Sequence, residues 1–136
     1  MSRFTQREEP LGRYLVGGRF FMLAEPICYE VGGLGSGEPI DVPKGFVTDF
    51  ASIPRVFLPV IGQEHGRRAA IVHDWLYATD GLNGKYTRQQ CDQIFLEALG
   101  ILDVSWIKRH LMYLAVRAGG WLPWRNPAPP RIEHHE

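Results

Sequence analysis

Two helical segments joined by a short, turn-rich connection constrain the fold of this chain more than any other feature. Residues 67–79 carry apolar side chains at the three- and four-residue spacing of an α-helix, and residues 87–99 do the same. The connection is DGLNGKY at 80–86, whose glycines and asparagine are typical of turns. Helices joined by so short a segment pack as neighbours, so we expect an antiparallel pair.

The first third of the chain has the pattern of short strands. The expected strands are residues 13–16, 19–23, 27–31, 39–42 and 45–49. Gly17-Gly18 suits the positive φ of a tight hairpin turn, so the strands are expected to pair antiparallel. The GGLGSG segment at 32–37 fits a loop rather than a dinucleotide site, because no helix follows it.

The middle of the chain predicts a short helix. Ser52 has the character of an N-cap, Pro54 suits an early helical position, and Pro59 and Gly62 are expected to end the helix. As a nucleophile Ser52 is a weak candidate, because no nucleophile-elbow sequence surrounds it.

Caps and breakers delimit the remaining helical part. Thr87 is expected to cap the second long helix and Gly100 to close it. A third helix is expected from Asp103 or Ser105 to about Ala118. The tail beyond it holds four prolines from Pro123 onward, so we expect it to be extended.

Together these elements predict an α+β fold in one domain, with antiparallel strands first and three helices afterwards. The length of 136 residues fits a single domain. The expected parts are an N-terminal arm at 1–12, a β-rich part at 13–50, a helical part at 51–120 and a Trp/Pro-rich tail at 121–136.

Charge and hydropathy exclude several functions. The 15 basic residues balance the 15 acidic ones, which argues against nucleic acid as the partner. No stretch is long and apolar enough for a transmembrane segment, and the N-terminus lacks the apolar core of a signal peptide. We therefore expect synthesis in the cytoplasm. Cys28 and Cys91 are expected to be free thiols, although a disulfide between them stays open.

The first long helix brings polar residues onto one face. Ala70, His73, Asp74 and Tyr77 share that face, because they follow the i, i+3, i+4, i+7 spacing. On the second helix, Asp92 is the charged member of an otherwise apolar stripe. A buried carboxylate needs a partner, and His73 is the natural one.

This pairing has a catalytic and a structural interpretation. A carboxylate bonded to one ring nitrogen of His73 leaves the other nitrogen free as a base. Asp74 then offers an oxygen ligand for a hard cation such as Ca²⁺, and Asp49 a further carboxylate. Tyr77, on the same helix face as His73, is a further candidate catalytic residue. Alternatively, the His–Asp pair is a satisfied core contact, Asp49 caps a helix or turn, and Tyr77 is a core residue bonding a carboxylate.

Four ordered segments carry a resemblance to a known family. They are VPKGFVTDFASIPR at 42–55, AAIVHDWLY at 69–77, CDQIFLEAL at 91–99 and MYLAVRAGG at 112–120. The chain from about Pro43 to Trp124 thereby resembles a phage and prophage family of unknown function, domain of unknown function 1353. The resemblance implies a viral or prophage origin and no particular activity.

A narrower resemblance concerns the helix pair. HDWLY at 73–77, followed one helix later by Cys91 and Asp92, is similar to the helices of small bacterial phospholipase A2 enzymes. It implies that His73 activates water, Asp74 binds calcium and Asp92 orients His73. The glycine-rich loop at 32–37 lies farther upstream than the calcium loop of those enzymes, and Cys91 alone is available for their interhelical disulfides.

Two functions follow as hypotheses. The first is a phage hydrolase that uses the His73–Asp92 dyad against the host envelope, with peripheral lipid contact. The second is a virion component, in the tail or baseplate, that retains the site as a structural feature. Trp106, Trp121, Trp124 and the proline-rich tail are the expected contacts to other virion proteins.

Overall fold

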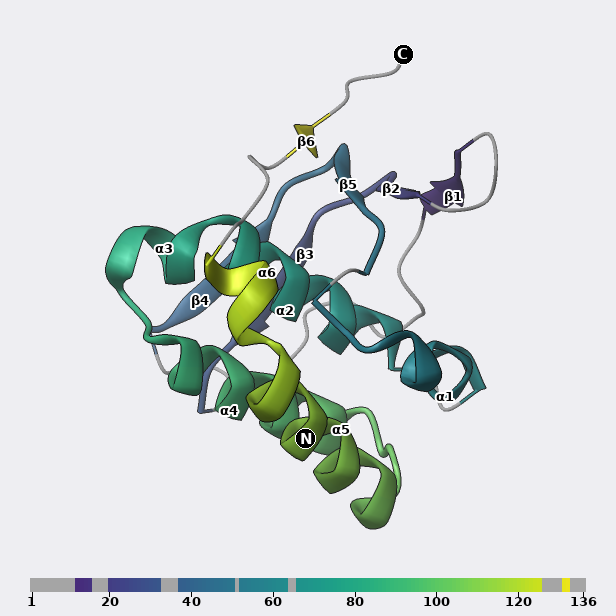
Figure 1. The fold of residues 1–136 in the computed structure, drawn as a ribbon. Helices are drawn as coiled ribbons and strands as arrows, with labels where there is room; N and C mark the ends of the chain where they lie inside the picture. Colours follow the sequence, from purple (N-terminus) through teal and green to yellow (C-terminus); the bar gives the residue numbers. More distant parts are fainter. Residues whose placement is uncertain are drawn as a thin grey trace.

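Strands and helices occupy separate parts of the chain, which confirms the α+β prediction (Figure 1). The computed structural model describes residues 12–15, 20–32, 37–50, 52–63, 66–125 and 131–132. Its strands are β1 (Gly12–Tyr14), β2 (Phe21–Leu23), β3 (Ile27–Glu30), β4 (Pro39–Val42), β5 (Phe46–Thr48) and β6 (Arg131–Ile132). The predicted turn at Gly17-Gly18 lies outside the described residues.

The strands form two small antiparallel sheets. One has the order β1-β2-β5-β6, and the other pairs β3 with β4. The register of the second sheet places Ile27 opposite Val42 and Tyr29 opposite Ile40, and all four side chains are buried. Every second residue of β3 therefore faces the core, as a strand with one buried face requires.

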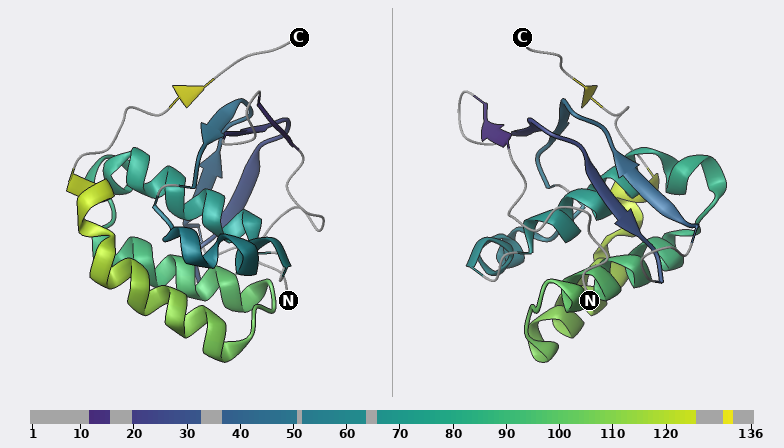
Figure 2. Two further views of the ribbon diagram at one scale, coloured as in Figure 1. Left: turned by 45° about the vertical axis from the view of Figure 1, so that its right-hand side comes forward. Right: turned by 180° about the vertical axis from the view of Figure 1, so that it is seen from behind.

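In the part of the chain that the structure describes, seven helical segments follow β5. They are the 3₁₀ turn η1 (Arg55–Phe57), α1 (Leu58–Gln63), α2 (Arg67–Ala78), α3 (Asp80–Gly84), α4 (Arg88–Ile101), α5 (Trp106–Gly119) and α6 (Trp121–Arg125). The helix α2 lies between the strands and α4, and α5 packs on the far side of α4 (Figure 2). A central position explains why most residues of α2 are buried.

The short helix after β5 differs from the prediction. Ser52 does not cap it, because the 3₁₀ turn begins at Arg55 with Pro54 in the N-cap position and no side-chain cap bond. Pro59 and Gly62 lie inside α1 instead of ending it. Pro59 occupies the first helical turn, where a missing N–H group costs least.

The helix α4 begins as predicted and ends later. Thr87 and Gln90 form a capping box, in which each side chain bonds the backbone N–H group of the other. Gly100 lies inside the helix, which ends at Ile101. Asp103 follows with a φ of 63°, and its N–H group donates to the Gly100 carbonyl at 3.1 Å.

Two further segments differ in detail from their prediction. The connection at 80–86 contains a left-handed helical turn, with φ between 55° and 66° at Asp80, Gly81, Leu82 and Asn83. The tail is helical at α6, which includes Pro123, where an extended chain was predicted. The ring of Trp124 packs edge-on against Tyr77 at 5.1 Å between centroids, so α6 covers one end of α2.

Candidate functional site

The centre of the candidate site is a hydrogen bond between α2 and α4. The Nε2 atom of His73 lies 2.7 Å from Oδ1 of Asp92, and both side chains are fully buried. The two helices pack side by side and run in roughly opposite directions, which brings positions 73 and 92 together (Figure 1). The expected antiparallel pair and the His73–Asp92 contact are both present.

Side chains of three helices contact the Asp92 carboxylate. The Tyr77 hydroxyl donates to Oδ1 at 2.6 Å, and Arg117 of α5 donates to Oδ2 at 2.9 Å. Arg88, one turn before Asp92, lies 3.6 Å from Oδ2. Burial alone would raise the pKa of Asp92, but the hydrogen bond and charge of His73, with the bonds from Tyr77 and Arg117, hold that pKa below its ordinary value. Asp92 is therefore a carboxylate.

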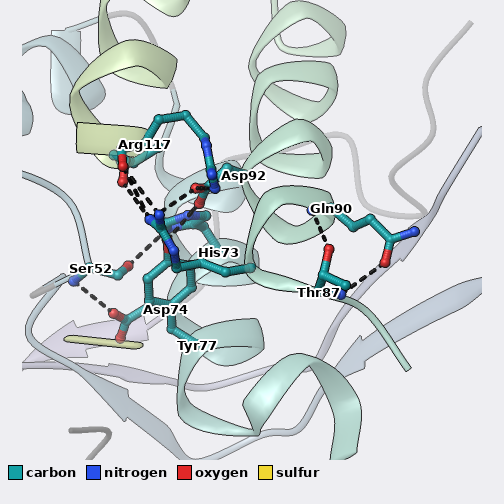
Figure 3. Close-up of polar contacts among 10 residues, drawn as sticks. Ser52, His73, Asp74, Tyr77, Thr87, Gln90, Asp92 and Arg117 are labelled. Carbon is teal, nitrogen blue, oxygen red and sulfur yellow. Dashed lines mark hydrogen bonds and ion pairs between the residues drawn. The ribbon is translucent and has the colours of Figure 1, made fainter. Parts of the chain in front are cut away.

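When the His73 ring is neutral, the ionised state of Asp92 fixes which ring nitrogen carries its hydrogen. A carboxylate only accepts hydrogen bonds, so Nε2 of His73 carries the hydrogen that it shares with Asp92. The Nδ1 atom of the neutral ring is then an acceptor. Its partner is the Ser52 hydroxyl, whose Oγ lies 3.0 Å away and donates to it. Ser52, His73 and Asp92 thus form one hydrogen-bonded chain (Figure 3).

Ser52 owes its position to the segment that follows β5. The hydroxyl of Thr48 accepts a bond from the backbone N–H group of Phe50 at 3.0 Å, and Phe50 has a φ of 59°. Ile53 then bonds back to the Phe50 carbonyl at 3.0 Å and buries its side chain. This tight turn directs Ser52 toward α2 instead of toward the following helix.

Asp74 also holds this segment. Its Oδ2 accepts the Thr48 hydroxyl, and its Oδ1 accepts the backbone N–H group of Ser52 at 3.2 Å. Burial of the carboxyl group raises the pKa of Asp74, the Thr48 and Ser52 hydrogen bonds oppose that rise, and the charge of Asp49 adds to it. The contacts of Asp74 therefore place it as the anchor between α2 and the Ser52 segment.

Asp74 and Asp49 are the residues for which the sequence predicts calcium binding. Both oxygens of Asp74 accept hydrogen bonds, and the charge of Asp49 acts on the same carboxyl group. Within the described ranges, no three His, Cys, Asp or Glu side chains cluster so that they could hold a metal ion. Calcium binding stays a prediction.

Tyr77 lies beside the His73–Asp92 pair. Its ring is 4.3 Å from the His73 ring between centroids, and Phe95 packs on His73 at 4.6 Å. Burial and the neighbouring Asp92 carboxylate raise the pKa of the Tyr77 hydroxyl far above its ordinary value. Tyr77 remains a protonated donor, so its contacts suit a positioning residue better than a catalytic acid or base.

The cysteines lie outside the hydrogen-bonded chain. Cys28 and Cys91 are both free thiols, as expected. Burial and the charge of Asp92 raise the pKa of Cys91 to about 12, so it is not a thiolate nucleophile at neutral pH.

The sequence predicts the His73–Asp92 contact but not two further partners of this pair. The first is Ser52, for which the sequence predicts a helix cap because a serine before Ile-Pro is typical of one. The second is Arg117, which lies 25 residues beyond Asp92 in the sequence and donates to it from α5. Helical spacing offers no signal for either contact, because both depend on how distant segments pack.

Comparison with known proteins gives one match. The model of a family described as a protein of unknown function (DUF1353) matches residues 21–116. No curated protein and no solved structure matches the chain. The matched segment extends from β2 into α5 and includes Ser52, His73 and Asp92.

Proposed function

The chain belongs to the DUF1353 family, and we propose that it is a phage-encoded hydrolase whose reacting groups are Ser52, His73 and Asp92. The observation that carries this proposal is the unbroken chain from Ser52 Oγ to His73 Nδ1, at 3.0 Å, and from His73 Nε2 to Asp92 Oδ1, at 2.7 Å. A serine, a base and an orienting carboxylate in this order are the components of nucleophilic acyl transfer.

The arrangement supports a two-step reaction on an ester or amide. Nδ1 of His73 takes the hydroxyl proton while Oγ of Ser52 bonds to the acyl carbon, and the Asp92 carboxylate stabilises the imidazolium. The imidazolium returns that proton to the leaving group as its bond to the acyl carbon breaks. Water, deprotonated by His73, then attacks the acyl-serine, and the proton moves back to Ser52 as the acid leaves.

The three reacting groups are shielded from bulk water. His73 and Asp92 are fully buried, and Ser52 is 4% exposed. Ser52 lies at one end of the hydrogen-bonded chain. Arg117 and Tyr77 lie at the opposite end, where they keep Asp92 ionised and His73 oriented.

A water-activating mechanism is the closest alternative within the hydrolase class. It corresponds to the resemblance to phospholipase A2, in which the histidine activates water and the next aspartate binds calcium. Here the Ser52 hydroxyl occupies Nδ1 of His73, and Asp74 is bonded to Thr48 and to the Ser52 backbone. These contacts favour serine as the nucleophile.

The test is hydrolysis by the purified full chain of short-chain phospholipids, p-nitrophenyl esters and bacterial cell-wall material, with calcium or with a chelator. We expect Ser52→Ala and His73→Ala each to lower the rate by about 10³-fold or more. Ser105→Ala, an exposed serine before α5, is the matched control and should retain the rate. Full activity of Ser52→Ala combined with loss in His73→Ala would replace the triad by a water-activating dyad. No hydrolysis under any of these conditions would overturn the proposal.

A non-catalytic virion component is the second candidate. It is favoured by the complete burial of His73 and Asp92, because a satisfied polar contact also stabilises a core without any chemistry. Mass spectrometry of purified particles is the test. Stoichiometric presence in the tail, together with inactivity on the substrates above, supports this role, whereas absence from particles contradicts it.

A further inference from the structure

The helix α5 exposes an apolar face that the fold does not use. Ile107 is 65% exposed and Leu114 61%, and Leu111 lies exposed between them. These three residues recur every three or four positions, so they form one stripe along the helix. Trp106, 64% exposed, lies at the beginning of α5, and Trp121, also exposed, lies just beyond its end.

The inward face of α5 packs into the hydrophobic core. Met112 and Val116 are fully buried, on the side where α5 packs on α4 (Figure 1). In both views of Figure 2, α5 lies on the side of α4 away from the sheets. The outward stripe is therefore additional to folding, and an exposed apolar patch of this kind typically marks an interaction surface.

The charges of α5 indicate what the stripe contacts. The helix contains Lys108, Arg109, His110 and Arg117 and no acidic residue. Arg109 bonds the Val104 carbonyl and Arg117 bonds Asp92, so both belong to the fold. Lys108 and His110 are neighbours of the stripe in the sequence, and Nδ1 of His110 lies 2.8 Å from the Trp106 carbonyl oxygen. A helix with an apolar stripe, aromatic ends and basic residues has the composition of one that lies in a membrane interface.

We propose that α5 docks flat on an anionic phospholipid bilayer, with Ile107, Leu111 and Leu114 entering the acyl boundary and Trp106 and Trp121 at the headgroup level. The ring of Trp106 stacks on His110 at 4.2 Å between centroids, which presents its indole beside the stripe. Tryptophan at both ends of the stripe fits the headgroup region, where an amphipathic ring is favoured. No helix in the described part of the chain is long and apolar enough to cross a membrane, so the contact is with the surface.

A second copy of the chain fits this face less well. Pairing two α5 helices along the stripe would bring together two helices that carry basic residues and no acidic one. An anionic headgroup layer has the charge opposite to that of the helix. The inference stands on the α5 surface and does not require that the chain be a hydrolase.

The experiment is flotation of the full-length protein with vesicles of phosphatidylglycerol and phosphatidylethanolamine, compared with vesicles of phosphatidylcholine. We expect binding to the anionic vesicles, a blue shift of tryptophan fluorescence, and weaker binding at high salt. The double variant Ile107→Glu/Leu114→Glu should bind at least about a hundredfold more weakly, because each side chain contributes about tenfold. Val56→Glu is the matched control, since Val56 is 75% exposed but lies on η1, and it should bind like the parent.

Three outcomes would overturn the proposal. They are absence of binding to anionic vesicles, equal binding to both vesicle types, and binding that the double variant leaves unchanged. Analytical ultracentrifugation of the same proteins identifies the competing occupant. A dimer that the double variant dissociates, without any vesicle binding, would assign the stripe to a second copy.

Discussion

Asp92 is the residue on which the stability of the buried site depends most. Its carboxylate accepts hydrogen bonds from His73, Tyr77 and Arg117, each at 2.9 Å or less. A buried charge with this number of donors is tolerated because the donors replace its hydration. Removing it leaves an uncompensated arginine and two unpaired donors in the same small volume.

We expect Asp92→Ala to lower the free energy of unfolding by about 3–5 kcal/mol, the usual cost of breaking a buried charge pair. Chemical denaturation monitored by circular dichroism measures the change. The matched control is Asp41→Ala, an exposed aspartate on β4, which should change stability by less than about 0.5 kcal/mol. Equal effects of the two substitutions would contradict the assigned network.

The pKa of Asp92 predicts how stability depends on pH. The pKa is lowered in the folded protein, so the stabilising contribution is complete above the unfolded value of about 3.9 and is lost as pH falls through the folded value. We therefore expect the unfolding free energy to fall less steeply below about pH 4 in Asp92→Asn than in the parent chain. Urea unfolding at a series of acidic pH values measures both slopes, and identical slopes would contradict this role.

The ionisation of Asp74 changes stability with pH in the opposite direction. Its pKa is raised in the folded protein, so its contribution is greatest below the unfolded pKa and declines as pH rises through the folded value. The two neighbouring carboxyl groups of the site thus oppose each other in their pH dependence. Asp92 favours its ionised form, and Asp74 resists ionisation.

Among the secondary-structure elements, the connection between α2 and α4 has the most unusual backbone. Asp80, Leu82 and Asn83 adopt positive φ together with Gly81, so the chain makes a left-handed turn. L-residues avoid this conformation by about 1–2 kcal/mol each. The turn is nevertheless formed because it ends α2 and starts α4 in the register that pairs His73 with Asp92.

The two glycines of this turn provide a matched pair of substitutions. A Cβ atom at Gly81 would lie 2.0 Å from the Tyr86 carbonyl oxygen, whereas at Gly84 it would meet open space, and both residues have positive φ. We expect Gly84→Ala to cost about 1–2 kcal/mol for its backbone alone. Gly81→Ala should cost at least about 2 kcal/mol more, because backbone must also move. Equal thermal denaturation midpoints would contradict this difference.

Elements were predicted best where periodicity was long. The helix α2 matches its predicted range to within one residue, and the Thr87 cap of α4 is confirmed. The helix ends predicted at Pro59 and Gly100 and the extended chain predicted from Pro123 are wrong, because all three residues lie inside helices. Proline in a first turn and glycine packed against a neighbour cost little, and only tertiary structure reveals that context.

In the whole molecule, four segments that are distant in the sequence meet at the buried site. The segment after β5 supplies Ser52, α2 supplies His73, α4 supplies Asp92 and α5 supplies Arg117. The sequence predicted the central pair, because two helices with a short connection restrict each other. It did not predict the outer contacts, because a loop serine and a third helix approach the pair only through the packing of the complete domain.

Covalent labelling shows whether His73 activates Ser52. We predict that a fluorophosphonate probe modifies the intact protein once, that the adduct maps to Ser52, and that His73→Ala abolishes the labelling while circular dichroism shows a folded chain. Intact-mass and peptide mass spectrometry measure both results. An unlabelled parent protein, an adduct on another residue, or equal labelling of His73→Ala would contradict the proposed triad.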